Sequence, residues 1–174
     1  MKKTEKKIFF MKFIKNPKSI GSIYPSSLQL AQKINQIIDK LEKVNILEIG
    51  PGTGAITRQI LEKNPTLIEI DSDLCEILKE KFTDLKIINS CALKELNQIN
   101  HEVGIVLTMP LINNPNKEIL LKILSQKYLE KKIKWCVVYT YGYTNPLSGT
   151  CFINQRKEKF CLFNLPPANI WVYT

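Results

Sequence analysis

The segment 45–57, NILEIGPGTGAIT, constrains the fold more than any other part of the sequence. An apolar run ends in three alternate glycines, Gly50, Gly52 and Gly54, and a helix-like stretch follows. Glycines there permit a tight turn and bring the backbone close to a ligand, while a helix N-terminus offers free N–H groups. The pattern is neither the G-x-G-x-x-G of dinucleotide sites nor a phosphate loop. It predicts a binding turn for a ligand that presents no phosphate there.

Strand-like and helix-like segments alternate along most of the chain. Five strands are expected. One helix precedes the first strand, and a helix separates each strand from the next. This spacing predicts right-handed crossovers and a mostly parallel sheet covered by helices on both faces. Two further strand-like runs, 158–165 and 168–174, have no helix between them and predict an antiparallel hairpin at one edge. The expected strands are 44–50, 66–71, 85–90, 102–109 and 131–141, and the expected helices are 27–41, 55–63, 72–82, 92–98 and 116–130.

Two acidic residues, Glu69 and Asp71, end the second expected strand. In a doubly wound sheet, an acidic residue at this place hydrogen-bonds the hydroxyls of a ribose. Together with the glycine turn, this favours a ribose-containing ligand, with both acids as candidates. Ser72 or Asp73 is expected to cap the helix that follows.

The ordered segments ILEIGPGTGAITRQIL, LIEIDSDLCEIL, IINSCALKEL and GIVLTMPL resemble the motifs of class I S-adenosylmethionine (SAM)-dependent methyltransferases. The segment FIKNPKSIGSIYPSSLQLAQKI and the ending NLPPANIWVY narrow the resemblance to the bacterial phospholipid N-methyltransferases. The resemblance implies a Rossmann-like α/β fold with a seven-stranded sheet, SAM as cofactor, and methylation of the amine headgroup of a phospholipid such as phosphatidylethanolamine. It also implies a division into residues 1–27, a basic helix and covering loop, and residues 28–174, one SAM-binding domain.

The same resemblance assigns roles to individual residues. The three glycines line the methionine part of SAM, Glu48 orients the turn or the amino group, and Glu69 binds the ribose. Residues 107–111 form the wall between the cofactor and the substrate, and the loop 21–27 covers the site. The cofactor residues are therefore Glu48, Gly50, Gly52, Gly54, Glu69, Cys91 and Thr108, the substrate residues are Ser26, Ser27 and Pro110, and the catalytic candidates are Tyr24 and Tyr141.

Cys91 departs from the family's pattern. The resemblance implies an acidic residue there, which accepts from the adenine amino group, but a thiol is a poor acceptor. Asn89, Ser90 or backbone groups could compensate. A chain that binds no SAM, a membrane-binding pseudo-methyltransferase, is therefore one alternative.

The N-terminal segment combines lysines with bulky apolar residues at helical spacing. With the net charge of +9, it suggests an anionic partner, and a short basic amphipathic helix suits the surface of an anionic membrane. Packing of this helix on its own domain is equally consistent. The membrane candidates are Lys6, Lys7, Phe9, Phe10, Lys12 and Phe13. A cytoplasmic protein at the inner face of the membrane, without a metal site or a protein partner, is the expectation.

The second functional alternative is an RNA adenine methyltransferase. The rRNA adenine dimethylases share EIGPGTGAIT and an acidic residue like Glu69, and the charge suits RNA. Against this alternative, a flipped base is held by stacking, and the segment after the fourth expected strand, TMPL, has no aromatic residue.

Overall fold

The computed structural model describes residues 28–111, 114–140, 144–161 and 168–174. They form one seven-stranded sheet in the order β3-β2-β1-β4-β5-β7-β6. The parallel strands are β1 (Asn45–Ile49), β2 (Thr66–Glu69), β3 (Ile87–Asn89), β4 (Val103–Leu107) and β5 (Ile133–Thr140). The last two strands, β6 (Gln155–Cys161) and β7 (Ala168–Tyr173), are antiparallel, and β7 pairs with β5. The predicted α/β sheet with an antiparallel edge hairpin is confirmed.

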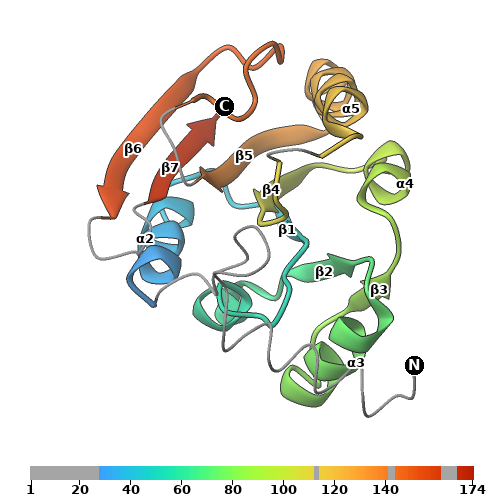
Figure 1. Cartoon of the computed structure of the whole chain (residues 1–174). Helices are drawn as coiled ribbons and strands as arrows, with labels where there is room; N and C mark the ends of the chain where they lie inside the picture. Colours follow the sequence, from blue (N-terminus) through green and yellow to red (C-terminus); the bar gives the residue numbers. More distant parts are fainter. Residues whose placement is uncertain (1–27, 112–113, 141–143, 162–167) are drawn as a thin grey trace.

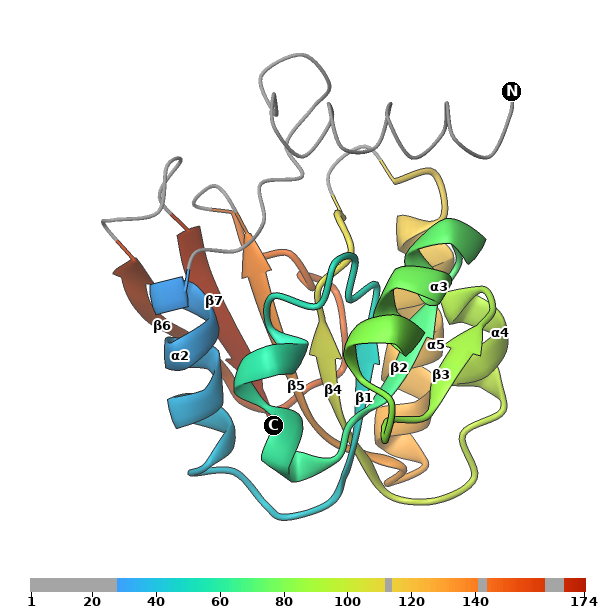
Figure 2. The same ribbon diagram turned by 90° about the horizontal axis from the view of Figure 1, so that it is seen from below.

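Helices cover both faces of the sheet (Figures 1 and 2). On one face lie α2 (Leu28–Ile38), the two short 3₁₀ turns η2 (Thr57–Gln59) and η3 (Leu61–Lys63), and α3 (Ser72–Lys81). On the other face lie α4 (Ala92–Asn97) and α5 (Lys117–Leu129). Apolar strand residues alternate between the two, so that Ile46 packs toward α2 and Ile105 packs toward α5. No helix in the described ranges is both long and apolar enough to cross a membrane.

The prediction of an α-helix at 55–63 is wrong. The chain forms η2 and η3 there, with i→i+3 bonds such as that from Gln59 N to Ile56 O, 2.8 Å. Three β-branched residues, Ile56, Thr57 and Ile60, are poor helix formers. In addition, Asn64 takes a left-handed conformation at the end of η3 and stops the segment.

The cap predicted for the third helix is also wrong. Asp71, not Ser72 or Asp73, caps α3, because its carboxylate accepts from Asp73 N at 2.8 Å and from Leu74 N at 3.1 Å. Strand β2 ends at Glu69, two residues earlier than expected, and this frees Asp71 for the cap.

Gly104 on β4 leaves room for a large side chain on the neighbouring strand β5. A Cβ atom on this residue would lie 2.0 Å from Cζ2 of Trp135, its partner on β5. The Trp135 side chain is buried, and its Nε1 donates to Glu42 O at 2.9 Å. The indole therefore occupies the space that a larger residue at 104 would need.

We expect Gly104→Ala to lower the free energy of unfolding by about 2–3 kcal/mol, because a buried indole must move. Chemical denaturation followed by circular dichroism measures this change. Trp135→Phe removes the ring atoms that clash, so the double variant should lose less than the sum of the two single variants. Additive losses would contradict the steric explanation.

Candidate functional site

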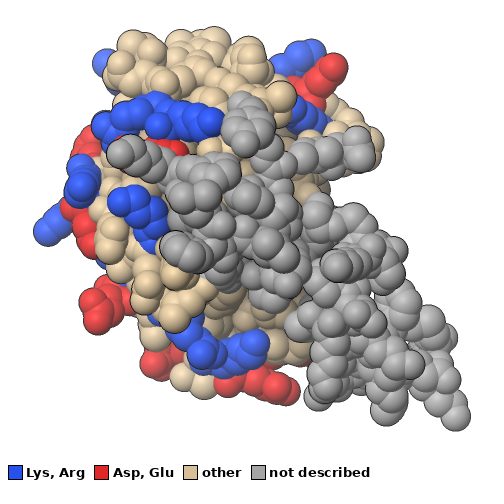
Figure 3. Space-filling view, turned by 60° about the vertical axis from the view of Figure 1, so that its left-hand side comes forward, with Lys and Arg blue, Asp and Glu red and all other residues tan. Residues whose placement is uncertain are grey.

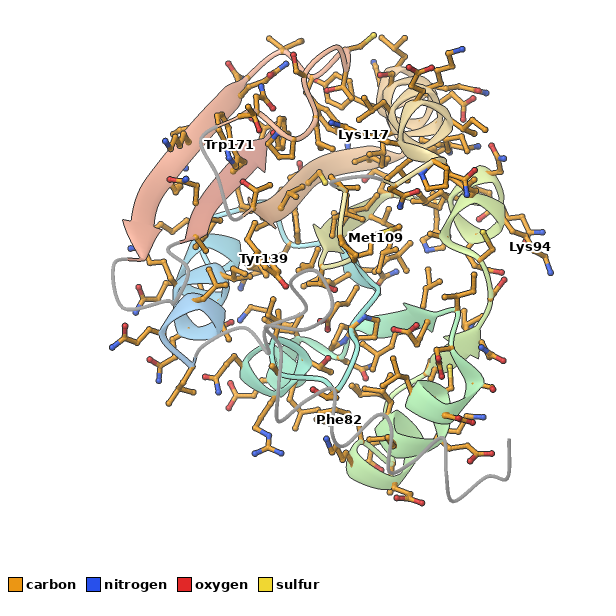
Figure 4. The ribbon with its side chains drawn as sticks, in the orientation of Figure 1. Phe82, Lys94, Met109, Lys117, Tyr139 and Trp171 are labelled. Atoms are coloured by element: carbon orange, nitrogen blue, oxygen red, sulfur yellow. The ribbon has the colours of Figure 1, made fainter. Side chains whose placement is uncertain are left out.

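The glycine turn lies at the carboxyl end of β1, between β4 and α3. Gly50, Gly52 and Gly54 have φ of +74°, +60° and +80°, which only glycine adopts readily. A Cβ on Gly50 would lie 2.7 Å from Met109 Cβ, and one on Gly54 would lie 2.3 Å from Phe82 Cε2. Figure 4 shows these two side chains, Met109 after β4 and Phe82 after α3. Gly52 has no atom near its Cβ position, so the middle of the turn is its open part.

The carboxylate of Glu69 connects this turn to the end of β2. Its Oε2 accepts from Gly52 N at 3.2 Å, and its Oε1 accepts from Asp71 N at 3.0 Å. Each oxygen has a second lone pair for a ligand hydroxyl. Of the two acids predicted for a ribose, Glu69 lies against the glycine turn, whereas Asp71 serves as the cap of α3.

Sequence reasoning missed Ile70, which lies between these two acids. Its side chain is 72% exposed, the second largest value among the exposed large apolar residues. Asn89, at the end of β3, donates from Nδ2 to the carbonyls of Glu69 and Ile70, both at 3.0 Å. These bonds fix the backbone carbonyls of Glu69 and of the exposed isoleucine that follows it. An apolar residue between two acids at a strand end was the available signal.

Cys91 lies in the predicted region, directly after β3. It occupies the N-cap position of α4, and its partly exposed side chain makes no capping hydrogen bond. The side-chain amide of nearby Asn89 has a fixed orientation, because its nitrogen donates hydrogen bonds to two carbonyl oxygens.

Thr108 ties the segment after β4 to the glycine turn. Its hydroxyl is 2.8 Å from both Ile49 O and Gly50 O, and its N–H donates to Ile49 O at 2.9 Å. The next residues differ in exposure, because Pro110 is exposed whereas Leu111 is buried in the core. The structure therefore brings Thr108 and Met109 against the turn and leaves Pro110 on the surface beside it.

Glu48 lies beneath the turn and is completely buried. It is paired in register with Leu67 of β2 and Val106 of β4. Its Oε2 accepts from the Thr57 hydroxyl at 2.7 Å, and its Oε1 has no hydrogen-bond partner in the described structure. Burial raises the pKa of the Glu48 carboxyl from 4.5 to about 8, although the hydrogen bonds from Thr57 act in the opposite direction.

The remaining predicted site residues lie outside the described residues. These are Tyr24, Ser26, Ser27 and Tyr141, together with the membrane candidates Lys6, Lys7, Phe9, Phe10, Lys12 and Phe13. Within the ranges that the structure covers, no group of His, Cys, Asp and Glu side chains could hold a metal ion.

The geometry suits SAM. The open turn at Gly52 can receive the methionine part, Glu69 can receive the ribose hydroxyls, and Ile70 can contact the adenine ring. SAM bound there would supply an activated methyl group. The open space at Gly52 is an observation of this chain that a bound ligand would explain.

The family model of ribosomal RNA adenine dimethylases matches residues 2–142. A ribosomal RNA small subunit methyltransferase A from Mycoplasma capricolum is 32% identical over 166 residues, which cover 84% of this chain and 62% of the relative. The protein of the same name from Pelagibacter ubique is 44% identical over 86 residues, which are 47% of this chain and 32% of the relative. The matched parts thus span less than two thirds of these relatives.

Solved structures agree on the fold. The 23S rRNA methyltransferase ErmE superimposes with a TM-score of 0.64 at 15% identity, covering 83% of this chain and 66% of ErmE. A SAM-dependent methyltransferase from Archaeoglobus fulgidus has the same TM-score and identity and covers 95% of this chain and 98% of its own. At such low identity, these similarities show the Rossmann-like methyltransferase fold alone.

Replacing Glu69 by Gln should raise the Kd of SAM about 10- to 100-fold, because hydrogen bonds to a charged acceptor are lost and an amide N–H faces backbone N–H groups. Isothermal titration calorimetry measures this change. Glu62→Gln, an exposed glutamate on η3, is the matched control and should leave Kd unchanged. Equal affinities of the Glu69 variant and the wild type would exclude Glu69 from the ribose site.

The pKa of Glu48 predicts a stability that depends on pH. Because its folded-state pKa is raised from 4.5 to about 8, the protein's stability relative to Glu48→Gln should be greatest below 4.5 and fall as pH rises toward 8. The slope should approach about 1.4 kcal/mol per pH unit in this window. Urea unfolding of both proteins at several pH values measures the difference. Parallel pH profiles would contradict the assignment.

The resemblance to phospholipid N-methyltransferases is wrong, and with it the predicted lipid substrate and membrane partner. The family model and the curated relatives overturn it. The error arose from the segments 13–34 and 164–173, which were used to narrow the resemblance to that family. The glycine turn and the acid at the end of β2 belong to cofactor binding, which many methyltransferases share. The expected SAM-dependent methyltransferase class and SAM as cofactor are confirmed. The chain belongs to the ribosomal RNA adenine dimethylase family.

Proposed function

We propose that this chain transfers methyl groups from SAM to the amino group of adenine bases in RNA of the small ribosomal subunit. The observation that carries the proposal is the match of the rRNA adenine dimethylase model to residues 2–142. The name of the relatives, ribosomal RNA small subunit methyltransferase A, gives the class of RNA.

The site supports methyl transfer by positioning. Displacement at a sulfonium methyl produces a neutral leaving group, so no acid is required, and the rate depends on alignment of the attacking nitrogen. The adenine amino nitrogen shares its lone pair with the ring, so acceptors that hold its hydrogens make it a better nucleophile. The segment that begins at Thr108 lies against Gly50 and is the nearest described backbone on the β4 side of the turn.

The segment after β4, residues 108–111, has no aromatic residue on which a base could stack. Leu111 is only 5% exposed and packs in the core between the sheet and α5, so it cannot stack on a base. Met109 is partly exposed and Pro110 is exposed, and both can make apolar contact with a purine face. This arrangement favours weaker retention of a flipped base than aromatic stacking would provide.

Charge supports an RNA partner. The net charge is +9, and electrostatic attraction to phosphates contributes most of the sequence-independent affinity for RNA. Two cations flank the glycine turn: Arg58 is exposed on η2, and Lys81 Nζ, also exposed, donates to Thr53 O at 3.0 Å. Figure 3 shows Lys and Arg side chains at several places on one face, with acidic side chains among them.

The direct test is a transfer assay with methyl-labelled SAM and small ribosomal subunits that lack this modification. Digestion of the RNA and separation of the nucleosides should give label in N6-methylated adenosine. Liposomes containing phosphatidylethanolamine, incubated in parallel, should remain unlabelled. Absence of label from RNA in a preparation that binds SAM would overturn the proposed acceptor.

Thr108→Val should lower the rate of methyl transfer about 10-fold or more while changing the Kd of SAM less than about 3-fold, because loss of the hydroxyl loosens the segment on the acceptor side. Single-turnover transfer and calorimetry measure the two effects separately. Thr150→Val is the matched control, since the hydroxyl of Thr150 donates to Leu147 O at 2.7 Å in another part of the fold. Equal losses of rate in both variants would attribute the effect to stability.

A further inference from the structure

Glu48 is a buried acid with only one oxygen in use. Its side chain has no exposed surface, its Oε2 accepts from Thr57 at 2.7 Å, and its Oε1 has no partner in the described part of the chain. An unsatisfied buried polar atom costs free energy in a folded protein.

Among the residues that the structure describes, no opposite charge compensates this carboxyl. Strand β4 contains no ionisable residue, and Glu69 on β2 is bound to two backbone N–H groups. Arg58 on η2 is exposed, and Lys33 on α2 is partly exposed. None of these groups contributes to the raised pKa of Glu48, which follows from burial and, within the described part of the chain, is opposed by the Thr57 hydrogen bonds.

The position of Glu48 connects it with the cofactor. Glu48 lies two residues before Gly50 and Thr57 lies three residues after Gly54, so their hydrogen bond joins the two ends of the glycine turn. The methionine part of SAM carries positive charges on the ammonium and on the sulfonium and one negative charge on the carboxylate, so it is a net cation. A cation placed near a neutral carboxylic acid favours the ionised form and lowers its pKa.

We propose that Glu48 senses the charge of the cofactor: it is a neutral acid in the ligand-free protein and releases its proton when the cationic methionine part of SAM binds at the glycine turn. The O–H bond of the carboxyl breaks, the proton passes to the solvent, and no bond of SAM changes. The inference rests on the proposed function, because it requires SAM as the ligand. It makes Glu48 a positioning residue whose affinity contribution depends on the ligand's charge.

The test is calorimetry of the full chain in buffers of different ionisation enthalpy, which counts the protons released on binding. Three ligands separate the charges: SAM has both, S-adenosylhomocysteine has the ammonium only, and methylthioadenosine has neither. Near pH 7 we expect close to one proton released per SAM, and an affinity that rises up to about tenfold per pH unit below the pKa of free Glu48. Methylthioadenosine should release none.

Glu48→Gln provides the control for titration of the ligand's own amine. It should bind SAM with a proton count reduced by nearly one and with a flatter pH profile. Thr57→Val removes the hydroxyl that lowers the pKa, so it should shift the rise in affinity to higher pH, and it serves as the second variant should Glu48→Gln not fold. Binding of S-adenosylhomocysteine shows which charge causes proton release from Glu48. Release equal to that with SAM would identify the ammonium as the cause, and smaller release would identify the sulfonium.

The outcomes distinguish this inference from the proposed function. SAM binding without proton release, or with the same release in Glu48→Gln, would overturn the role of Glu48 and leave the methyltransferase proposal intact. Proton release with methylthioadenosine would also overturn it, since that ligand has no positive charge. Absence of any SAM binding would overturn both.

Discussion

The glycine turn after β1 is held in place by contacts from its two neighbouring strands, β2 and β4, and the candidate site depends on them. Glu69 at the end of β2 accepts from Gly52 N, and Thr108 after β4 donates its hydroxyl toward the Ile49 and Gly50 carbonyls. Met109 lies so close to Gly50 that no side chain fits there. Because the three strands are parallel, their carboxyl ends meet at one edge, and polar groups that follow each strand converge on the same turn.

Two glutamates near this turn have different environments and serve different purposes. Glu69 receives two backbone N–H donors, which fix its oxygens beside the open part of the turn. Glu48 receives one hydroxyl donor in a fully buried place, which makes its charged form costly. Glu69 therefore provides an acceptor with fixed oxygens. Glu48 provides a carboxyl group whose charge, as proposed, responds to the bound ligand. The turn between them couples the two, since its ends are joined through Glu48 and Thr57.

The sequence predicted the sheet and the cofactor side of the site because both depend on local patterns. The alternation of strand-like and helix-like segments, the three alternate glycines and the acid at the end of the second strand are all patterns of residues close together in the sequence. The 3₁₀ turns at 57–63 and the cap at Asp71 were missed because they depend on competition between nearly equivalent local conformations. Ile70 was missed because exposure of an apolar residue is a tertiary property. The acceptor was predicted wrongly, because the segments used for it, 13–34 and 164–173, pointed to a family that the family model and the curated relatives do not support.

The acceptor side also explains why the choice between lipid and RNA was difficult from sequence. Its described part is short: Thr108 is engaged with the turn, Pro110 is exposed and Leu111 is taken into the core. Such a wall can align an acceptor through backbone groups and small apolar contacts. These do not require characteristic residue types, so the sequence does not reveal them. Recognition must then come largely from surfaces outside the wall, where cations such as Arg58 beside the turn can contact a phosphate backbone. For the proposed RNA acceptor, the positioning of the polynucleotide, more than contacts with the base, would decide which adenine reaches the methyl group.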